Sequence, residues 1–418
     1  MLKRLCRKYG FVLAAYCLAA GLFLVCRAPA LRQENSHPTP WDSGWYASIW
    51  VHGYGYDRDA AKQQNIVFSP LYPLLCYITN KVLHFAYPHN TMLVVSLGLS
   101  LLSVIFLFKL LYPLYGDVIA ARATTLFVLN PFAIYLFNGY AEAAWVLCIT
   151  LFFYFLIAKS NPYLAALCVA LGSTSRPYGI ILLAILIFHL SYLYVKKYGL
   201  KIDLSAREVR AAAICIPLSF LGLAIYTTYL REYFGNPLAF QQALAAWGVT
   251  SLFGVKISAF FTLKYVFYNL VRPFWGGIPH PHVPVFLVHP FWISAAFFLA
   301  MPMLLLAYRK QIPATLIFFT VFLMAFYYIP AYDGPWLMVN MGRRLMVCFP
   351  FALTLAFACD GRGRAELLSG SILNVEEDYP LTTHFINIVT WRFGLILIAF
   401  AALFAKYTYE YYCFRWIS

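Results

Sequence analysis

Charged residues are scarce in this chain. Only 11% of its 418 residues are charged, against roughly a quarter in an average soluble domain. Acidic residues are the scarcest, with 16 Asp and Glu against 31 Lys and Arg. So few charges cannot cover a water-facing surface, which excludes a soluble enzyme and a disordered protein.

Paired cysteine motifs are absent as well. None of the ten cysteines forms a Cys-x-x-Cys pair, which argues against a disulfide framework and a cysteine metal site. Five of them lie inside apolar runs and are expected to be small buried hydrophobes: Cys17, Cys148, Cys168, Cys215 and Cys348. Prolines surround His280, His282 and His289, and no further ligand stands at a metal-like spacing. We therefore predict no metal and no cofactor.

Long apolar runs fill most of the sequence. Hydrophobic residues make up 62% of the chain, and the stretch 92–108 is almost continuously apolar. Runs of about 20 apolar residues cross a bilayer as helices, whereas a barrel strand would alternate. The sequence predicts a single all-α polytopic membrane domain over 1–418, with about eleven transmembrane helices (roughly nine to thirteen).

Charge sets the expected topology. Basic residues precede the first apolar run, 11–25, and place the N-terminus in the cytoplasm. Ala28-Pro-Ala30 also resembles a signal-peptidase site, but in either case 27–66 is an extended first extracytoplasmic loop. The stretch 360–390, with Glu376, Glu377 and Asp378, is expected to be a cytoplasmic loop. Further spans are expected at 91–111, 118–137, 142–158, 163–174, 177–195, 211–229, 284–307, 312–330, 344–359 and 393–412.

The net charge of +15 has a membrane explanation. Its basic residues form short clusters between apolar runs, so no basic groove with stacking aromatics results, and no nucleic-acid partner is predicted. Some cations, such as Arg231, Arg343 and Arg344, fall on the expected outer side. This excess of positive charge on the outer side indicates that an anion binds there.

Asp42 is the most informative acidic residue. It lies in Pro40-Trp41-Asp42-Ser43-Gly44-Trp45-Tyr46, just after the first span. A carboxylate among aromatic rings at a membrane interface is costly to desolvate unless it is paired or functional. A general base and a structural aspartate in an interfacial aromatic belt both fit. Asp57 and Asp59 lie in a more polar stretch and are expected to be solvated.

The same loop ends in Phe68-Ser-Pro70-Leu-Tyr72-Pro73. Two prolines so close together favour non-helical backbone that re-enters the membrane. Such backbone is tolerated where it is buried in protein or lines a cavity. We therefore expect a cavity beside Asp42 on the outer face.

These segments resemble the first outer loop of the PIG-V-like mannosyltransferases, that is, GPI mannosyltransferase II and its prokaryotic relatives in the GT-C glycosyltransferase superfamily. Three later segments fit the family in order, and the match covers about residues 40–350. They are Asn138-Gly-Tyr140-Ala-Glu142, Thr174-Ser-Arg176-Pro177-Tyr-Gly179, and 234–248 with Trp247. Asn236 departs from the family pattern, in which an acidic residue is expected.

The resemblance implies a GT-C-like fold and an inverting transfer of a sugar, with mannose as the family's sugar. The donor is a dolichyl or polyprenyl phosphate and the acceptor a glycan or glycolipid, on the extracytoplasmic face. Asp42 is expected to be the base, with Glu142 as a second catalytic acid or, equally, a helix N-terminal carboxylate. Arginines suit the donor phosphate, and the candidates are Arg176, Arg343 and Arg344. The expected substrate pocket comprises Trp41, Trp45, Tyr46, Tyr72 and Trp247.

Other functions remain open from the sequence. A transporter or flippase of a lipid-linked substrate is the first alternative, although its inverted repeats are not visible. A non-catalytic subunit of a larger complex is the second. The segment 234–248 resembles the loop more typical of the bacterial branch of the family, and this resemblance implies a bacterial or archaeal cytoplasmic membrane, with the endoplasmic reticulum as the eukaryotic alternative.

Overall fold

The computed structural model describes residues 2–34, 36–59, 61–201, 203–247, 290–328, 342–360 and 388–413. Within these ranges the regular structure is helical and no strand occurs. Five helices are long and apolar enough to cross a membrane, and five shorter apolar helices accompany them in the same ranges. The prediction of an all-α polytopic membrane protein is therefore confirmed.

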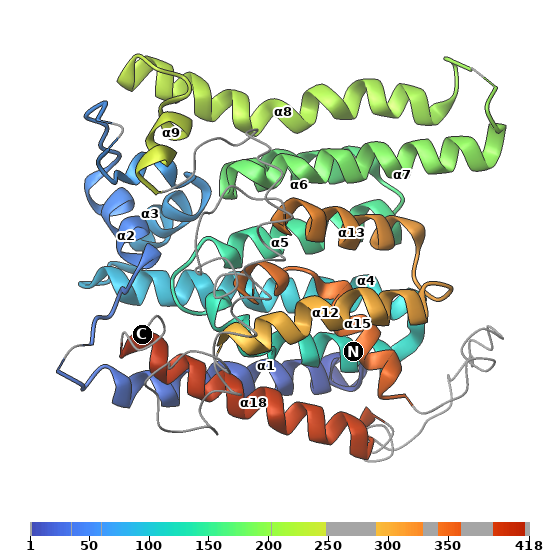
Figure 1. Ribbon diagram of the computed structural model, residues 1–418, viewed down its shortest axis with the longest axis horizontal. Coiled ribbons are helices and arrows are strands. Elements are labelled where there is room, and N and C mark those ends of the chain that lie inside the picture. The colour runs from blue at the N-terminus through green and yellow to red at the C-terminus, as the bar shows by residue number, and fades with distance from the viewer. Residues whose placement is uncertain are drawn as a thin grey trace, which may run out of the picture.

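The spanning helices lie side by side in one bundle, shown with its long axis horizontal in Figure 1. The long helices are α1 (Leu2–Ala30), α4 (Pro88–Val128), α7 (Ile181–Tyr198), α8 (Arg207–Phe234) and α18 (Trp391–Tyr412). The shorter helices are α5 (Glu142–Phe153), α6 (Pro162–Ser175), α12 (Pro290–Tyr308), α13 (Ala314–Tyr328) and α15 (Phe349–Ala358). One large hydrophobic core joins them, because their apolar faces pack against one another.

The helix α4 consists of two parts. Gly116 has a φ of +73°, a conformation that glycine adopts at little cost, and it interrupts the helical backbone there. The sequence predicted two separate spans, 91–111 and 118–137. The second part is shorter than predicted: after Val128 the chain turns into a 3₁₀ segment, Pro131–Leu136.

Two short helices gather at one end of the bundle, here called the α2 end (Figure 1). They are α2 (Asp42–His52) and α3 (Leu71–Leu83), and the short α9 (Ala239–Gln242) lies beside them. The prediction of a non-helical re-entrant segment is wrong from Leu71 onward. Pro70 stands just before α3 and Pro73 falls in its first turn, where a proline breaks no helical hydrogen bond.

A buried ion pair joins α4 to the C-terminal end of α15. Arg122 Nη1 lies 2.7 Å from Asp360 Oδ1, and Arg122 Nε donates to the Ile388 carbonyl at 2.7 Å. Both side chains are at most 2% exposed. No pattern in the sequence indicates this ion pair, because its two residues are far apart along the chain.

Four of the five cysteines expected to be buried are buried, but Cys17 is exposed on the surface of α1. A hydropathy pattern cannot tell which face of a membrane helix meets lipid and which meets protein, so the prediction for Cys17 is wrong. Predictions about His280, His282, His289 and the acidic residues Glu376, Glu377 and Asp378 fall outside the described residues.

The contact between α6 and α8 depends on the absence of a side chain at Gly222. A Cβ at this position would lie 2.0 Å from the Ala170 carbonyl oxygen and 2.9 Å from Thr174 Cγ2. We therefore expect Gly222→Ala to force the helices apart and to destabilise the protein by about 1–3 kcal/mol. Gly98→Ala is the matched control, because nothing lies within 4 Å of its added Cβ. Thermal unfolding in detergent measures both, and equal midpoints would contradict the prediction.

Candidate functional site

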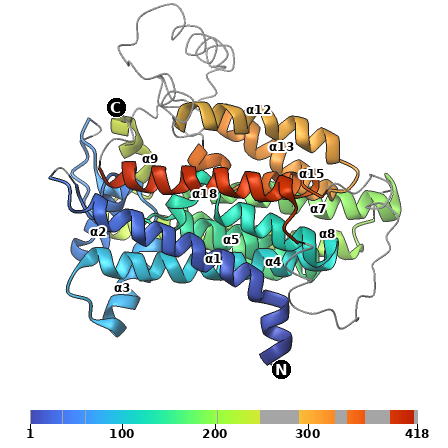
Figure 2. The ribbon, with the colours of Figure 1, turned by 90° about the horizontal axis from the view of Figure 1, so that it is seen from below.

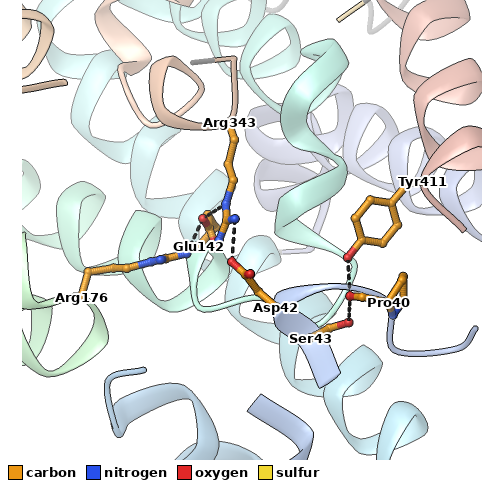
Figure 3. A network of polar contacts seen from close by, with 7 residues as sticks. All are labelled: Pro40, Asp42, Ser43, Glu142, Arg176, Arg343 and Tyr411. Carbon is orange, nitrogen blue, oxygen red and sulfur yellow. Dashed lines mark hydrogen bonds and ion pairs between the residues drawn. The ribbon is translucent and has the colours of Figure 1, made fainter. Parts of the chain in front are cut away.

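Asp42 is the first residue of α2, and the backbone before it is firmly held. The Pro40 carbonyl accepts hydrogen bonds from Ser43 Oγ at 2.5 Å and from the Tyr411 hydroxyl at 3.0 Å (Figure 3). Tyr411 belongs to α18, so the end of the last helix fixes the start of α2. The Asp42 side chain is 25% exposed and faces the other charged residues in Figure 3.

Glu142 begins α5 and follows a tight turn. Gly139 in that turn has a φ of +82°, and a Cβ there would lie 3.0 Å from Met92 Cε. A glycine is therefore needed for the backbone to pass α4 at this point. The Glu142 side chain is only 5% exposed. Its place in the first helical turn agrees with the helix-terminal interpretation, and its ion pairs give it a second role.

Two arginines reach this carboxylate from different elements (Figure 3). Arg176 stands at the C-terminus of α6 in an extended conformation, as expected for a residue before a proline. Its Nη2 lies 2.5 Å from Glu142 Oε1. Arg343 precedes α15; its Nε donates to the same Oε1, and its Nη1 donates to Asp42 Oδ2 at 2.7 Å.

These four side chains form one cluster of two cations and two carboxylates, here called the charged cluster: Asp42, Glu142, Arg176 and Arg343. The guanidinium of Arg343 also lies over the rings of Tyr140, at 4.4 Å, and Tyr135, at 5.1 Å. Such cation–π contacts stabilise a desolvated guanidinium. The sequence does not indicate that either tyrosine contacts Arg343, although Tyr140 belongs to a matched motif.

Both arginines stay charged despite their burial. Desolvation lowers the pKa of Arg343, but the facing carboxylates of Glu142 and Asp42 outweigh it and hold that pKa well above its usual value. Desolvation likewise lowers the pKa of Arg176, and Glu142 more than compensates. The cluster is therefore an ionic network, not a set of neutral hydrogen bonds.

Three polar atoms of the charged cluster have no hydrogen-bond partner among the described residues. They are Glu142 Oε2, Arg176 Nε and Arg343 Nη2, all shielded from solvent. Buried polar atoms are almost always satisfied in folded proteins, and an unpaired one costs about 1–3 kcal/mol. Unpaired donors beside a partly exposed carboxylate indicate a place where a polar ligand binds.

The structure thus brings Asp42, Glu142, Arg176 and Arg343 together, as a shared site requires. The sequence assigned the arginines to a phosphate and the acids to catalysis, and it did not anticipate that they would pair with one another. Arg344 follows Arg343 directly and is partly buried, but the ion pairs of the cluster are those of Arg343.

The predicted pocket aromatics separate into two groups. Trp45 stacks on Phe68 at 6.1 Å and meets Trp247 edge-on at 5.5 Å, and Trp247 contacts Phe68 at 5.4 Å. The partly buried Trp45 and Trp247 and the buried Phe68 form a wall beside α2. Tyr46 and Tyr72, in contrast, are at most 1% exposed.

Packing explains the second group. The Tyr72 hydroxyl donates to the Met92 carbonyl at 3.0 Å and lies 2.8 Å from Ser96 Oγ. Tyr46 packs edge-on against Phe68 and Tyr72. Tyr46 of α2 and Tyr72 of α3 therefore pack in the core that joins these two helices to α4. Trp41, at the N-cap of α2, is 39% exposed.

Two further acids of the first outer loop, Asp57 and Asp59, are solvated, as predicted. Asp57 and Asp59 are exposed, and Asp57 forms a surface ion pair with Lys62 at 2.8 Å. The hydrogen bond from Lys62 lowers the pKa of Asp57. Among the described residues, no group of three or more His, Cys, Asp or Glu side chains is placed to hold a metal ion.

Comparisons with known proteins find similarity in the structure alone. No protein-family model matches the sequence, and no curated protein matches it either. ArnT from Cupriavidus metallidurans, solved with bound undecaprenyl phosphate, is similar with a TM-score of 0.51 and 13% identity. The match covers 98% of this chain and 77% of ArnT.

An oligosaccharyltransferase from Archaeoglobus fulgidus, solved with a tethered acceptor peptide, is similar with a TM-score of 0.53 and 13% identity. That match covers 98% of this chain and 56% of the other, so the chain spans about half the length of the oligosaccharyltransferase. At these identities the likeness establishes the fold. The chain has the GT-C-like membrane fold that the sequence predicted.

The charged cluster should contribute strongly to stability. Glu142→Gln removes the carboxylate that faces two buried arginines, and breaking such a pair costs about 3–5 kcal/mol. Glu410→Gln is the matched control. Glu410 pairs with Lys406 one turn away in α18, both side chains are 24–29% exposed, and such a pair contributes only about 0.3–0.5 kcal/mol. Thermal unfolding in detergent compares the two variants, and similar losses would show that the cluster is not a structural unit.

Proposed function

We propose that this protein is an integral-membrane glycosyltransferase that transfers a sugar from a polyprenyl-phosphate donor to an acceptor hydroxyl at the α2 end of the bundle. One observation carries the proposal. Four charged side chains from four distant segments meet there in a half-buried cluster that holds unpaired donors beside a carboxylate.

An inverting sugar transfer needs a base, an anion site and an apolar support for the lipid. Asp42 suits the base, because Arg343 contacts its Oδ2, no partner is found for its Oδ1 among the residues that the structure describes, and its side chain is 25% exposed. Its Oδ1 is then available for the hydroxyl proton of an acceptor. The helix that carries Asp42 is fixed by Tyr411 and Ser43 through Pro40, which gives the base a defined position.

Arg176 and Arg343 suit the phosphate. The Nε of Arg176 and the Nη2 of Arg343 are buried and have no hydrogen-bond partner within the described ranges, and guanidinium groups bind phosphate oxygens with matched geometry. Glu142 Oε1 holds both guanidinium groups in place, so Glu142 is a positioning residue here. The wall of Trp45, Phe68 and Trp247 offers aromatic faces for a sugar or the first isoprene units.

The finer assignments rest on the resemblance. Mannose as the sugar and membership of the PIG-V-like family are proposed from the matched motifs around Asp42, Glu142 and Arg176. A glycan or glycolipid acceptor on the extracytoplasmic face follows from the same resemblance. ArnT, which shares the fold, has been solved with undecaprenyl phosphate, which supports a lipid phosphate as the donor group.

Asp42→Asn tests the base. The amide keeps the shape of the side chain but accepts no proton, so we expect the turnover number to fall by about 10²–10⁴-fold. Asp57→Asn, on an exposed acid of the same loop, is the control and should keep normal turnover. Transfer is measured with purified protein by detection of the glycosylated product.

Unchanged turnover in a folded Asp42→Asn variant would remove Asp42 from the mechanism. If the wild-type protein transfers no sugar but moves the labelled donor across a vesicle membrane, the transporter alternative replaces the proposal.

A donor comparison tests the sugar. Purified protein is incubated with prenyl-phospho-mannose and, separately, with prenyl-phospho-glucose, together with a membrane extract as the acceptor source. The proposal predicts a product with mannose only, identified by mass spectrometry. A product with glucose alone would keep the glycosyltransferase assignment and reject the PIG-V-like one.

A further inference from the structure

A polar pocket separate from the charged cluster lies at the α2 end, on the side of the bundle where α1, α4 and α18 meet. Figure 2 shows these three helices side by side. The pocket is an open hollow with an enclosed space of only about 10 Å³, and Arg27, Thr39, His89, Asn138 and Tyr412 are among its lining residues. None of these residues belongs to the charged cluster.

Polar atoms of two side chains in this pocket have no hydrogen-bond partner among the described residues. Asn138 is 4% exposed, and neither its Nδ2 nor its Oδ1 forms a hydrogen bond with the described residues. The Nε of Arg27 is likewise buried and unpaired in the part of the chain that the structure describes. A buried amide with both polar atoms unsatisfied is costly, so this combination indicates a missing polar ligand.

The charge of the pocket favours an anion. Arg27 lies over the ring of Tyr412 at 5.2 Å, and no carboxylate forms an ion pair with it among the described residues. His89 stands in the first turn of α4, at the positive end of the helix dipole. No acidic side chain lines the pocket.

The position of the pocket identifies the class of anion. Its enclosed space has room for about one oxygen atom, so the ligand presents a single oxygen there from a larger group that lies outside. Arg27 is in the last turn of α1 and Tyr412 is the last residue of α18. The ends of two spanning helices lie at the depth of lipid head groups.

We propose that this pocket binds the phosphodiester of a membrane phospholipid, with Arg27 and Asn138 as its ligands. The Arg27 guanidinium contacts a phosphate oxygen, and the Asn138 amide donates to the same oxygen through Nδ2. The site is separate from the proposed donor site and does not depend on sugar transfer.

A simpler arrangement would be an arginine that only reaches toward the head groups. That arrangement involves Arg27 alone. The pocket differs because Asn138 lies behind it on the loop that leads to Glu142, shielded from solvent, and its side-chain amide has no hydrogen-bond partner in the described part of the chain. Dependence on Asn138 therefore distinguishes a built site from a surface contact.

Native mass spectrometry of the full chain in detergent tests the site. Phosphatidylglycerol is titrated, and the fraction of protein with one bound lipid gives the apparent affinity. Each ligand should contribute about one charge-assisted hydrogen bond, so Arg27→Gln and Asn138→Ala should each weaken binding by about tenfold. Arg32→Gln is the matched control, because Arg32 is exposed just beyond α1 and outside the pocket.

Two further probes separate the possible sources of phosphate. Polyprenyl phosphate is titrated in the same way, and inorganic phosphate is tested by its effect on the thermal unfolding midpoint. Loss of phosphatidylglycerol binding in both variants, with the control unchanged, supports the proposal. Arg27-dependent and Asn138-dependent binding of polyprenyl phosphate or inorganic phosphate alone would assign the pocket to that other source and overturn the phospholipid.

Loss in Arg27→Gln but not in Asn138→Ala would also overturn the proposal, because it would mean a surface contact. Equal binding of phosphatidylglycerol by the wild-type protein and all variants would overturn it as well. The measurement detects lipid and not sugar transfer, so its outcome is independent of whether the proposed glycosyltransferase activity is found.

Discussion

The arrangement at the α2 end depends on one carboxylate oxygen, Glu142 Oε1, which is shared by two arginines. Arg176 is 34 residues away in the sequence and Arg343 is 201 residues away. Arg343 then extends the network to Asp42, 301 residues away. Because a buried charge without a partner costs several kcal/mol, these segments must meet for the chain to fold. The ionic network therefore fixes the positions of the groups that the proposed chemistry needs.

Hydropathy predicted the spans because a bilayer imposes a minimum apolar length on every crossing helix. It missed α2 and α3, since α2 has only eleven residues and α3 begins at two prolines that the first turn of a helix tolerates. The sequence motifs identify Asp42, Glu142, Arg176 and Arg343 as separate candidate site residues. Their pairing could not be predicted, because which distant segments meet is decided by packing and not by spacing.

The pocket around Arg27 and Asn138 depends on a property that the sequence alone does not contain. Arg27 stands at the end of an apolar run, where a cation is ordinary in any membrane protein. Asn138 belongs to a motif, and nothing in that motif indicates that its side chain binds a ligand. Their significance comes from burial without partners, a property of the folded chain. The same property marks Arg176 and Arg343, whose unsatisfied donors lie apart from this pocket in the part of the chain that the structure describes.

The charge balance of the cluster bears on how a transfer would proceed. Two guanidinium groups face two carboxylates, so a donor phosphate meets a cluster whose own charges already cancel. When an acceptor hydroxyl gives its proton to Asp42, that carboxylate becomes neutral and its hold on Arg343 Nη1 weakens. At the same stage the bond between the sugar and the phosphate breaks, and negative charge grows on the departing oxygen. The guanidinium freed by the base is then available to the leaving group, so in the proposed reaction the pairing of Asp42 with Arg343 couples proton removal to phosphate departure.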